Sequence, residues 1–294
     1  MNTFFRVAVF YSVWFCGAAL AGDTLGPEKG VLYISGGGQL NFNEFVQLVR
    51  KTTGEREPRI CVVTTAQGNR RTKAYNEGVP FRLVNTLKTR FKLEKTTELF
   101  TLRKEDANTE PYYGLIDEAD AVFMSGGNQS FLTDAFLGTK VHDAMLRLLE
   151  RGGVIGGSSA GAQAQSSFMT RGDYTQRSIL GDKKHQVGFG FVKNAAFDVH
   201  VSERSREKDL LKLFRAKPKQ LQEKGLNPLG LLGVGIDQGT TIIVEGNRFR
   251  VSGPNKVYVF DPQEWGEGVK PFYTELVKGQ VFDMKERRVL NPRD

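Results

Sequence analysis

Short apolar runs recur along the first half of the chain, and polar segments long enough to form helices separate them. The runs are rich in β-branched and aromatic residues, which favours buried strands. Helical spacing of apolar residues occurs between them. Predicted strands cover 31–34, 60–64, 91–100 and 119–124, and predicted helices cover 42–49, 79–89 and 141–151. This alternation indicates an α/β fold, with a mainly parallel sheet flanked by helices on both faces.

The pattern changes in the C-terminal third of the chain. Residues 197–201 predict a short strand, and residues 203–214 predict a charged amphipathic helix. Two apolar runs at 240–244 and 249–251, separated by turn-forming residues, predict a C-terminal β-hairpin region. No repeat or linker divides the sequence, so we expect one domain over residues 22–294.

The N-terminal segment does not read as part of that domain. Arg6 precedes an apolar run that ends in Ala19-Leu20-Ala21, which is typical of a secretory signal peptide and its cleavage site. An uncleaved anchor is the alternative, but the run is shorter than the roughly 20 apolar residues that span a bilayer. We therefore expect residues 1–21 to be removed, leaving a secreted or periplasmic protein without a membrane partner.

Composition narrows the classes of partner and cofactor. The net charge is +8, but 33 acidic residues are mixed with 41 basic ones and form no long basic tract, so nucleic acid is not an expected partner. Cys61 is the single cysteine beyond the signal segment, so no disulfide is expected. Three histidines without metal-ligand spacing give no metal site, and we expect no cofactor.

The glycine-rich segment 152–164 carries the main chemical signal. It contains G-x-S-x-G centred on Ser159, after an apolar run and before small helix-forming residues, which is the arrangement of a nucleophile elbow. Gly157 and Gly161 lack the Cβ atoms that would obstruct such a turn. The first N–H groups of the following helix would face a developing oxyanion. An ordinary glycine-rich turn is the alternative, because the chain contains 33 glycines.

A serine nucleophile requires a general base, and histidine is the usual one. His142 lies on the predicted helix before the elbow, and His185 lies in a predicted loop. His200 ends a predicted strand and follows Ser159 in the chain, as in sheet-based hydrolases. We therefore interpret His200 as the candidate base.

Charged residues surround His200 in the sequence. Strand alternation would place Asp198 on the same face as His200. Arg204 and Arg206 follow at the predicted start of a helix, where their guanidinium groups could bind substrate carboxylates. A solvated helix terminus is the alternative interpretation of the two arginines.

Five motifs together resemble a family of serine peptidases that includes cyanophycinase and aspartyl dipeptidase. They occur in the family's order across residues 31–245, and the chain looks closer to the cyanophycinase branch. The motifs are Gly36-Gly37-Gly38, the segment 123–129, the elbow at 157–162, Asp-x-His-x-x-x-Arg-x-Arg at 198–206, and the segment 235–240. The fold of this family is similar to class I glutamine amidotransferase domains.

The resemblance implies a set of roles and a substrate class. Ser159 would attack the scissile carbonyl, His200 would carry its proton, and the N–H groups of Gly127 and Ala160 would form the oxyanion hole. The implied substrate is cyanophycin, a poly-aspartate with arginine on its β-carboxylates, or a related β-aspartyl peptide. Short aspartyl peptides are the alternative, and a homodimer is implied weakly. The implied substrate contacts are Gln129, Asp198 (to an arginine side chain), and Arg204 and Arg206 (to aspartate carboxylates).

The sequence departs from this family pattern at the expected third catalytic residue. Gln238 stands where cyanophycinases carry a glutamate that orients the histidine. An amide can accept a hydrogen bond but cannot stabilise the imidazolium by charge. Asp237 or Asp173 could take its place, or the serine and histidine could act as a dyad.

Two further departures affect substrate recognition. Val199 replaces the usual glutamine beside His200, and Asp209 stands where a further substrate-binding arginine is expected. Together with Gln238, they leave a second class of function open, in which the protein is catalytically impaired and only binds its ligand.

Overall fold

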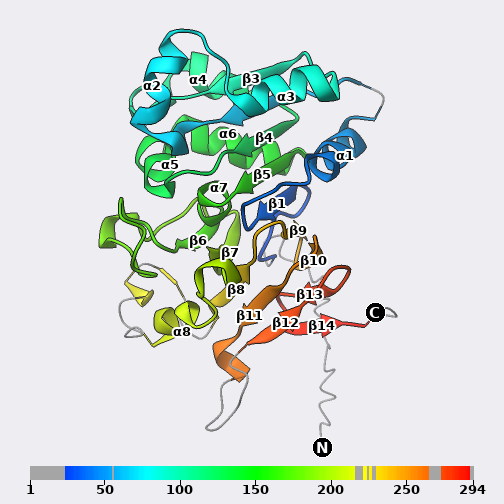
Figure 1. The fold of residues 1–294 in the computed structure, drawn as a ribbon, viewed down its shortest axis with the longest axis vertical. Helices are drawn as coiled ribbons and strands as arrows, with labels where there is room; N and C mark the ends of the chain where they lie inside the picture. Colours follow the sequence, from blue (N-terminus) through cyan, green and yellow to red (C-terminus); the bar gives the residue numbers. More distant parts are fainter. Residues whose placement is uncertain are drawn as a thin grey trace, which may run out of the picture.

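The structure is a computed structural model that describes residues 24–54, 56–215, 221–223, 225–226, 230–264 and 273–291. The expected signal peptide, residues 1–21, lies outside the described residues. The described strands form two sheets that lie next to each other (Figure 1). In the described part of the chain, no helix is both long enough and apolar enough to cross a membrane.

The larger sheet is parallel over the part that the sequence predicts. Its strand order is β14-β13-β10-β9-β1-β5-β4-β2-β3, and the strands from β1 to β3 in this order pair in parallel. These parallel strands are β1 (Val31–Ser35), β2 (Ile60–Val63), β3 (Thr96–Leu99), β4 (Ala121–Met124) and β5 (Val154–Ser158). The predicted strand at 91–100 is therefore shorter than expected, because Phe91 still belongs to helix α3 (Arg82–Phe91).

Helices cover both faces of this sheet, because successive residues of β1 pack into different core clusters. Leu32 and Ile34 pack with apolar side chains of one helix group, and Val31 and Tyr33 pack with those of the other. The first group contains α4 (Glu110–Asp117), α5 (Gln129–Phe136), α6 (Lys140–Glu150) and α7 (Ala160–Gln163), and the second contains α1 (Phe42–Thr53) and α3. Helix α2 (Asn69–Asn76) follows β2. The predicted α/β fold class is confirmed.

The predicted hairpin region continues the larger sheet. Strands β9 (Thr241–Glu245) and β10 (Arg248–Ser252) pair antiparallel, and β9 pairs with β1. Two short strands that the pattern did not predict, β13 (Val281–Asp283) and β14 (Arg288–Leu290), extend this edge. The hairpin therefore adds an antiparallel extension to the parallel sheet.

A second sheet, which the pattern did not predict, has the order β12-β11-β8-β7-β6. Its strands are β6 (Ser166–Met169), β7 (Val192–Val199), β8 (Leu232–Ile236), β11 (Val257–Phe260) and β12 (Thr274–Leu276). The prediction of one helix over 203–214 was wrong. The segment forms a 3-10 turn at Ser202–Arg204 and then a short helix α8 at Asp209–Phe214. Ser205 has φ +50°, a left-handed conformation that ends the turn.

The two sheets bring the candidate residues to one place. Ser35 at the end of β1 lies opposite Ser158 at the end of β5, and Met124 at the end of β4 lies opposite Gly157. The carboxyl ends of parallel strands share one edge of a sheet, which is where such folds place their chemistry. His200, which follows β7 of the second sheet, donates its backbone N–H to the carbonyl of Gly36 at 3.3 Å, so β7 ends at the same edge.

Candidate active site

The elbow has the tight geometry that the glycine spacing predicts. Ser159 lies between β5 and α7 with φ +53° and ψ −112°, a strained conformation for a residue with a side chain. A Cβ on Gly157 would lie 2.2 Å from the Gly161 carbonyl oxygen, and one on Gly161 would lie 2.3 Å from the Met124 carbonyl oxygen. Only glycine at both positions allows strand and helix to approach this closely.

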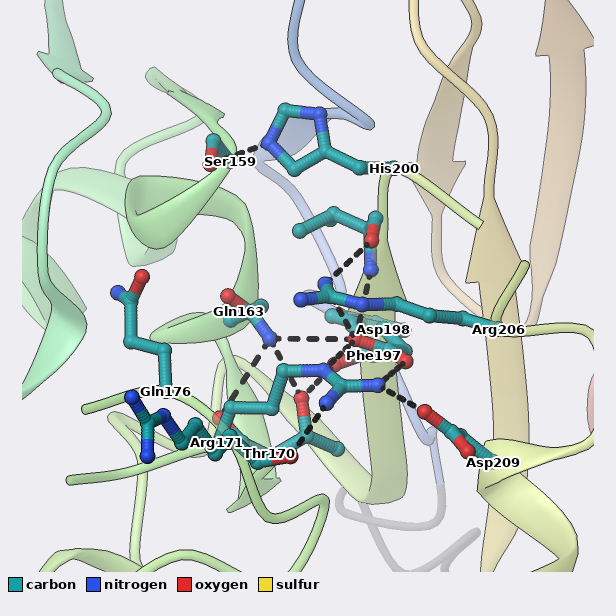
Figure 2. A network of polar contacts seen from close by, with 12 residues as sticks. Ser159, Gln163, Thr170, Arg171, Gln176, Phe197, Asp198, His200, Arg206 and Asp209 are labelled. Carbon is teal, nitrogen blue, oxygen red and sulfur yellow. Dashed lines mark hydrogen bonds and ion pairs between the residues drawn. The ribbon is translucent and has the colours of Figure 1, made fainter. Parts of the chain in front are cut away.

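Ser159 and His200 are in hydrogen-bond contact. The Oγ of Ser159 lies 2.8 Å from the Nε2 of His200, and Figure 2 shows the two side chains pointing toward each other. A Cβ on Gly37 would lie 2.3 Å from the Cε1 of His200, so the glycine loop after β1 packs directly against the imidazole ring. The residue pair required for nucleophilic catalysis is therefore assembled from two sheets and supported by a third segment.

Burial and charge keep His200 neutral. His200 is 8% exposed, and its burial, followed by the positive charges of Arg204 and Arg206, lowers its pKa to about 4. A neutral imidazole can accept a proton from the serine hydroxyl, whereas an imidazolium cannot. The site is therefore in the protonation state of a general base at neutral pH.

The Gly126-Gly127 turn lies beside the serine. A Cβ on Gly126 would be 3.4 Å from the Cβ of Ser159. Gly127 has φ +142°, and a Cβ there would lie 2.0 Å from the Ala66 carbonyl oxygen, which requires glycine. Over the described ranges, neither the Gly127 N–H nor the Ala160 N–H donates a hydrogen bond to the protein. Both donors are available for an oxyanion next to Ser159.

The second ring nitrogen of His200 faces no acid. Its Nδ1 is buried and has no hydrogen-bond partner within the described part of the chain. The side chain of Gln238 lies instead against Gly38, where a Cβ would come within 2.6 Å of its Oε1. The backbone of Gln238 is held by the Glu203 carboxylate and by the Asn255 side chain. Gln238 therefore does not orient the imidazole in this structure.

Neither aspartate that could replace the missing acid contacts His200. The carboxylate of Asp237 accepts hydrogen bonds from the N–H and the hydroxyl of Ser202 at 2.8 and 2.9 Å. The carboxylate of Asp173 accepts from the N–H and the hydroxyl of Thr175 at 2.6 and 2.7 Å. Both carboxylates cap local turns, so the geometry corresponds to the dyad among the three alternatives.

A groove of about 810 Å³ lies on the side of Gln238, and neither Ser159 nor His200 lines it. Gln238 is its link to the site, because the Gln238 side chain packs against Gly38 and the neighbouring Gly37 packs against His200. Much of its lining is polar, and it includes the amide side chains of Gln39, Asn41, Asn43, Gln238 and Asn255. No cluster of potential metal-ligating side chains occurs among the described residues. Amides that donate and accept hydrogen bonds suit a peptide backbone.

Comparison with known proteins identifies the family. Residues 31–252 match the model of Peptidase family S51. The chain belongs to peptidase family S51. This membership confirms the resemblance drawn from the five motifs, and by family the chain is a serine-type peptidase.

Two individual proteins illustrate this relationship. A cyanophycinase from Geminocystis herdmanii (strain PCC 6308) is 26% identical over 167 residues, which cover 55% of this chain and 56% of the relative. The aligned region thus spans just over half the length of that relative. The crystal structure of a peptidase from an acI-B1 Actinobacterium superposes with a TM-score of 0.61 at 21% identity, covering 88% of this chain and 98% of that one. This structural similarity supports the α/β fold described above.

Asp198 of this S51 chain does not lie open to substrate. Its side chain is 1% exposed, and its carboxylate is paired with Arg171 through Nε to Oδ1 at 2.9 Å and Nη2 to Oδ2 at 2.8 Å. Strand alternation also fails after Val199, because β7 ends there and His200 has φ +54°. The expectation that Asp198 meets a substrate arginine is therefore corrected, because a guanidinium of the chain itself already occupies it.

Gln129 is likewise engaged within the protein. It is completely buried, its amide nitrogen donates to the carbonyls of Thr170 and Arg171 at 2.9 and 2.8 Å, and its amide oxygen accepts from Gln176 at 2.9 Å. Gln176 also donates to the Gly127 carbonyl at 3.0 Å. Because its amide nitrogen and oxygen already have partners, Gln129 links the loop after β6 to the candidate oxyanion turn through Gln176. The expectation that Gln129 contacts substrate is therefore corrected.

The two expected arginines are the cationic groups beside His200. Arg204 is exposed, and Arg206 is half-buried with its Nη1 donating to the Val199 carbonyl at 3.0 Å. The pKa of Arg206 is lowered to about 10, mainly by burial; the charge of Asp198 opposes this shift, and the charges of Arg171 and Arg204 add to it. Recognition of substrate carboxylates by these two arginines stays a prediction.

Sequence reasoning missed Arg171. It lies 27 positions before Asp198 in a loop and carries no motif. The available signal was Asp209, an acid where an arginine was expected, because its carboxylate accepts from Nη2 of Arg171 at 2.6 Å. An acid at a position where an arginine was expected thus indicated that a cation elsewhere in the chain compensates it. Only the structure shows that this cation is Arg171.

Proposed function

We propose that this S51 chain hydrolyses β-aspartyl peptides, cyanophycin-like substrates among them, through an acyl-enzyme on Ser159. The observation that carries the proposal is the 2.8 Å contact between the Ser159 hydroxyl and the neutral imidazole of His200. A serine hydroxyl is a weak nucleophile at neutral pH and requires such a base. The absence of an acid at Nδ1 makes the pair a dyad in this proposal.

The chemistry follows from the positions of these groups. As the Ser159 oxygen bonds to the scissile carbonyl carbon, its proton moves to Nε2 of His200, and the carbonyl oxygen becomes an oxyanion beside the N–H groups of Gly127 and Ala160. The carbon–nitrogen bond then breaks, and the leaving amine takes the proton from His200. Water attacks the acyl-enzyme with the same base, which releases the acid and restores the serine hydroxyl.

The charges of the site support an acidic substrate. Arg204 and Arg206 lie close enough to His200 for their charges to lower its pKa. Guanidinium groups bind carboxylates through two parallel hydrogen bonds, and a β-aspartyl peptide carries a free α-carboxylate next to its scissile bond. A relative that carries the name cyanophycinase supports a substrate rich in aspartate.

We further propose that the mature protein is secreted or periplasmic, after removal of residues 1–21, and that it forms a homodimer. The apolar run after Arg6 and the Ala19-Leu20-Ala21 sequence support export. N-terminal sequencing of exported protein tests cleavage, with Gly22 expected as the first residue. Light scattering of the purified protein tests the dimer.

The decisive experiment compares the mature protein with Ser159→Ala on cyanophycin, β-aspartyl dipeptides and α-aspartyl dipeptides, with new amines as the readout. The variant should lose about 1,000-fold or more in kcat on any substrate that the wild type cleaves. Ser158→Ala, which changes the neighbouring serine only, should retain activity. Equal turnover by Ser159→Ala would overturn the serine mechanism. Binding without turnover by the wild type would favour a catalytically impaired binding protein. The Nδ1 of His200, which has no partner in the described part of the chain, is the observation that favours this alternative.

A further inference from the structure

Arg171 and Asp198 form a buried ion pair, which Figure 2 shows below the Ser–His pair with the side chain of Arg206 between them. Their side chains are 3% and 1% exposed. The guanidinium uses two of its nitrogens on one carboxylate, which is the strongest geometry for such a pair. Any cation from a substrate would have to displace this internal partner.

Further contacts hold the Arg171 side chain and backbone in place. Nη2 also donates to Asp209 at 2.6 Å, and Nη1 donates to the Arg177 carbonyl at 3.3 Å. The backbone carbonyl of Arg171 accepts from the buried Gln129 amide at 2.8 Å. Arg171 also has φ +53°, so the loop holds it in a conformation that residues with side chains rarely adopt. The position of the guanidinium is therefore built into the loop.

Arg171, which is buried, and Arg206, which is half-buried, differ in how well their charges are compensated. Although burial opposes it, the hydrogen bonds and charges of Asp198 and Asp209 raise the pKa of Arg171 above its ordinary value. Arg206 lies 3.7 Å from Asp198 Oδ1 and donates to a neutral carbonyl, and burial lowers its pKa. Asp198 therefore pairs closely with Arg171 and only at 3.7 Å with Arg206, so Arg206 is less fully compensated and keeps charge to offer a ligand.

We propose that Arg171 is a specificity-determining residue, a guanidinium supplied by the chain that closes Asp198 to cationic side chains of the substrate. The inference rests on the proposed function and narrows it. The charges that act on His200 are those of Arg204 and Arg206, and the carboxylate of the neighbouring Glu203 is engaged by the N–H of Gln238. The recognised substrate group is then a carboxylate, and an arginyl group on a β-aspartyl peptide gains nothing from this site.

The turnover test uses two β-aspartyl dipeptides, one ending in arginine and the other in citrulline, whose neutral urea has nearly the shape of a guanidinium. Wild-type kcat/KM values for the two should agree within about threefold. Arg171→Ala removes the bidentate partner of Asp198 and leaves only the longer 3.7 Å contact with Arg206, so it should raise the arginine-to-citrulline ratio about tenfold or more. Arg171→Lys keeps a cation on Asp198 and should retain the wild-type ratio. A wild-type preference for arginine that Arg171→Ala does not increase would overturn the proposal.

A binding test separates this inference from the proposed function. Ser159→Ala and Ser159→Ala/Arg171→Ala are titrated with ethylguanidinium chloride, with sodium chloride as the ionic-strength control, and both affinity and melting temperature are measured. Only the double variant should bind ethylguanidinium at millimolar concentration and melt at a higher temperature with it. Equal responses of the two proteins would overturn the inference, whatever either protein hydrolyses.

A second variant, Asp209→Asn, tests the proposal if Arg171→Ala does not fold. Asp209→Asn removes one of the two carboxylates that hold Arg171 and keeps the arginine in place. It should raise the arginine-to-citrulline ratio by a smaller factor, about threefold, because the guanidinium is held less firmly. A ratio unchanged by Asp209→Asn would then count against the proposal.

Discussion

Ser159 and His200 lie 41 positions apart in the chain, yet their side chains meet at 2.8 Å, and both residues have a left-handed backbone conformation. Their φ angles are +53° and +54°, values that cost free energy for residues with a Cβ. Each residue follows the end of a strand, β5 for Ser159 and β7 for His200. The sharp turns that these angles produce aim the two side chains at each other across the junction of the two sheets.

The packing of Gly37 against the imidazole predicts a loss of activity on Gly37→Ala. A Cβ at this position would lie 2.3 Å from His200 Cε1, so the ring must move away from Ser159. A displacement of about 1 Å at a reacting group can cost on the order of 100-fold in rate. We therefore expect kcat to fall by roughly that factor.

Gly279→Ala is the matched control for Gly37→Ala. Gly279 has φ +89°, close to the +97° of Gly37, and a Cβ there would meet nothing within 4 Å. Both variants therefore carry similar backbone strain, but only Gly37→Ala should lose activity at equal folded fraction. Equal losses in the two would assign the effect to strain and not to the imidazole.

The acid limb of the pH profile should lie unusually low. His200 must be neutral to accept a proton, so activity is present above its pKa and is lost as the pH falls through about 4. An ordinary histidine would give this limb near 6.5. The profile of kcat/KM reports the free enzyme and is the measurement to make. A limb near 6.5 would contradict the role of burial and neighbouring charge.

The arginines should move that limb. Arg206→Gln removes a positive charge that lowers the pKa of His200, so the limb of kcat/KM should shift to higher pH. A substrate carboxylate that neutralises the arginines should act in the same direction, so the limb of kcat should lie above that of kcat/KM. Lys208→Gln, an exposed residue whose charge does not perturb His200, should leave the limb in place.

The unpartnered Nδ1 of His200 predicts that Gln238→Glu is a gain-of-function change. A carboxylate that reaches Nδ1 would stabilise the imidazolium formed during attack, whereas an amide cannot do so by charge. We expect kcat at neutral pH to rise about tenfold or more, with the pKa of His200 raised as well. Steady-state kinetics and the pH profile check both effects.

Asp237→Asn is the control for Gln238→Glu. The Asp237 carboxylate binds Ser202 and not His200, so its charge should matter little to the base. A large loss of rate at unchanged turn geometry, as judged from a structure of the variant, would restore Asp237 as the catalytic acid. No gain from Gln238→Glu would mean that the dyad needs no third residue.

The buried ion pair predicts a marked loss of stability on Asp198→Asn. The change leaves Arg171 buried with one charged partner, Asp209, and breaking such a pair costs about 3 kcal/mol or more of unfolding free energy. The control is Glu275→Gln, which removes the exposed ion pair between Glu275 and Lys256. Its N···O distance of 2.6 Å is similar to that of the buried pair, but its loss should leave the stability unchanged within error. Urea unfolding of both variants checks this, and equal effects would contradict the stabilising role of the buried pair.

Local patterns in the sequence determined the fold class and the candidate nucleophile. Alternating strand and helix periodicities specify a parallel sheet with covered faces, because side-chain periodicity decides which face is buried. Gly157, Ser159 and Gly161 specify the elbow, because only glycine tolerates the contacts of that turn. These features depend on neighbours in sequence and were therefore predictable.

The tertiary structure alone decided which charged groups meet. Arg171 pairs with Asp198, which lies 27 positions later in the chain. The amide of Gln129 donates its hydrogen bonds to backbone carbonyls of the loop after β6. Neither Asp237 nor Asp173 reaches His200. The path of a loop and the register between two sheets set these pairings, and a one-residue shift would change them all. The candidate catalytic pair could thus be predicted from sequence, whereas the charges left for a substrate depend on the fold.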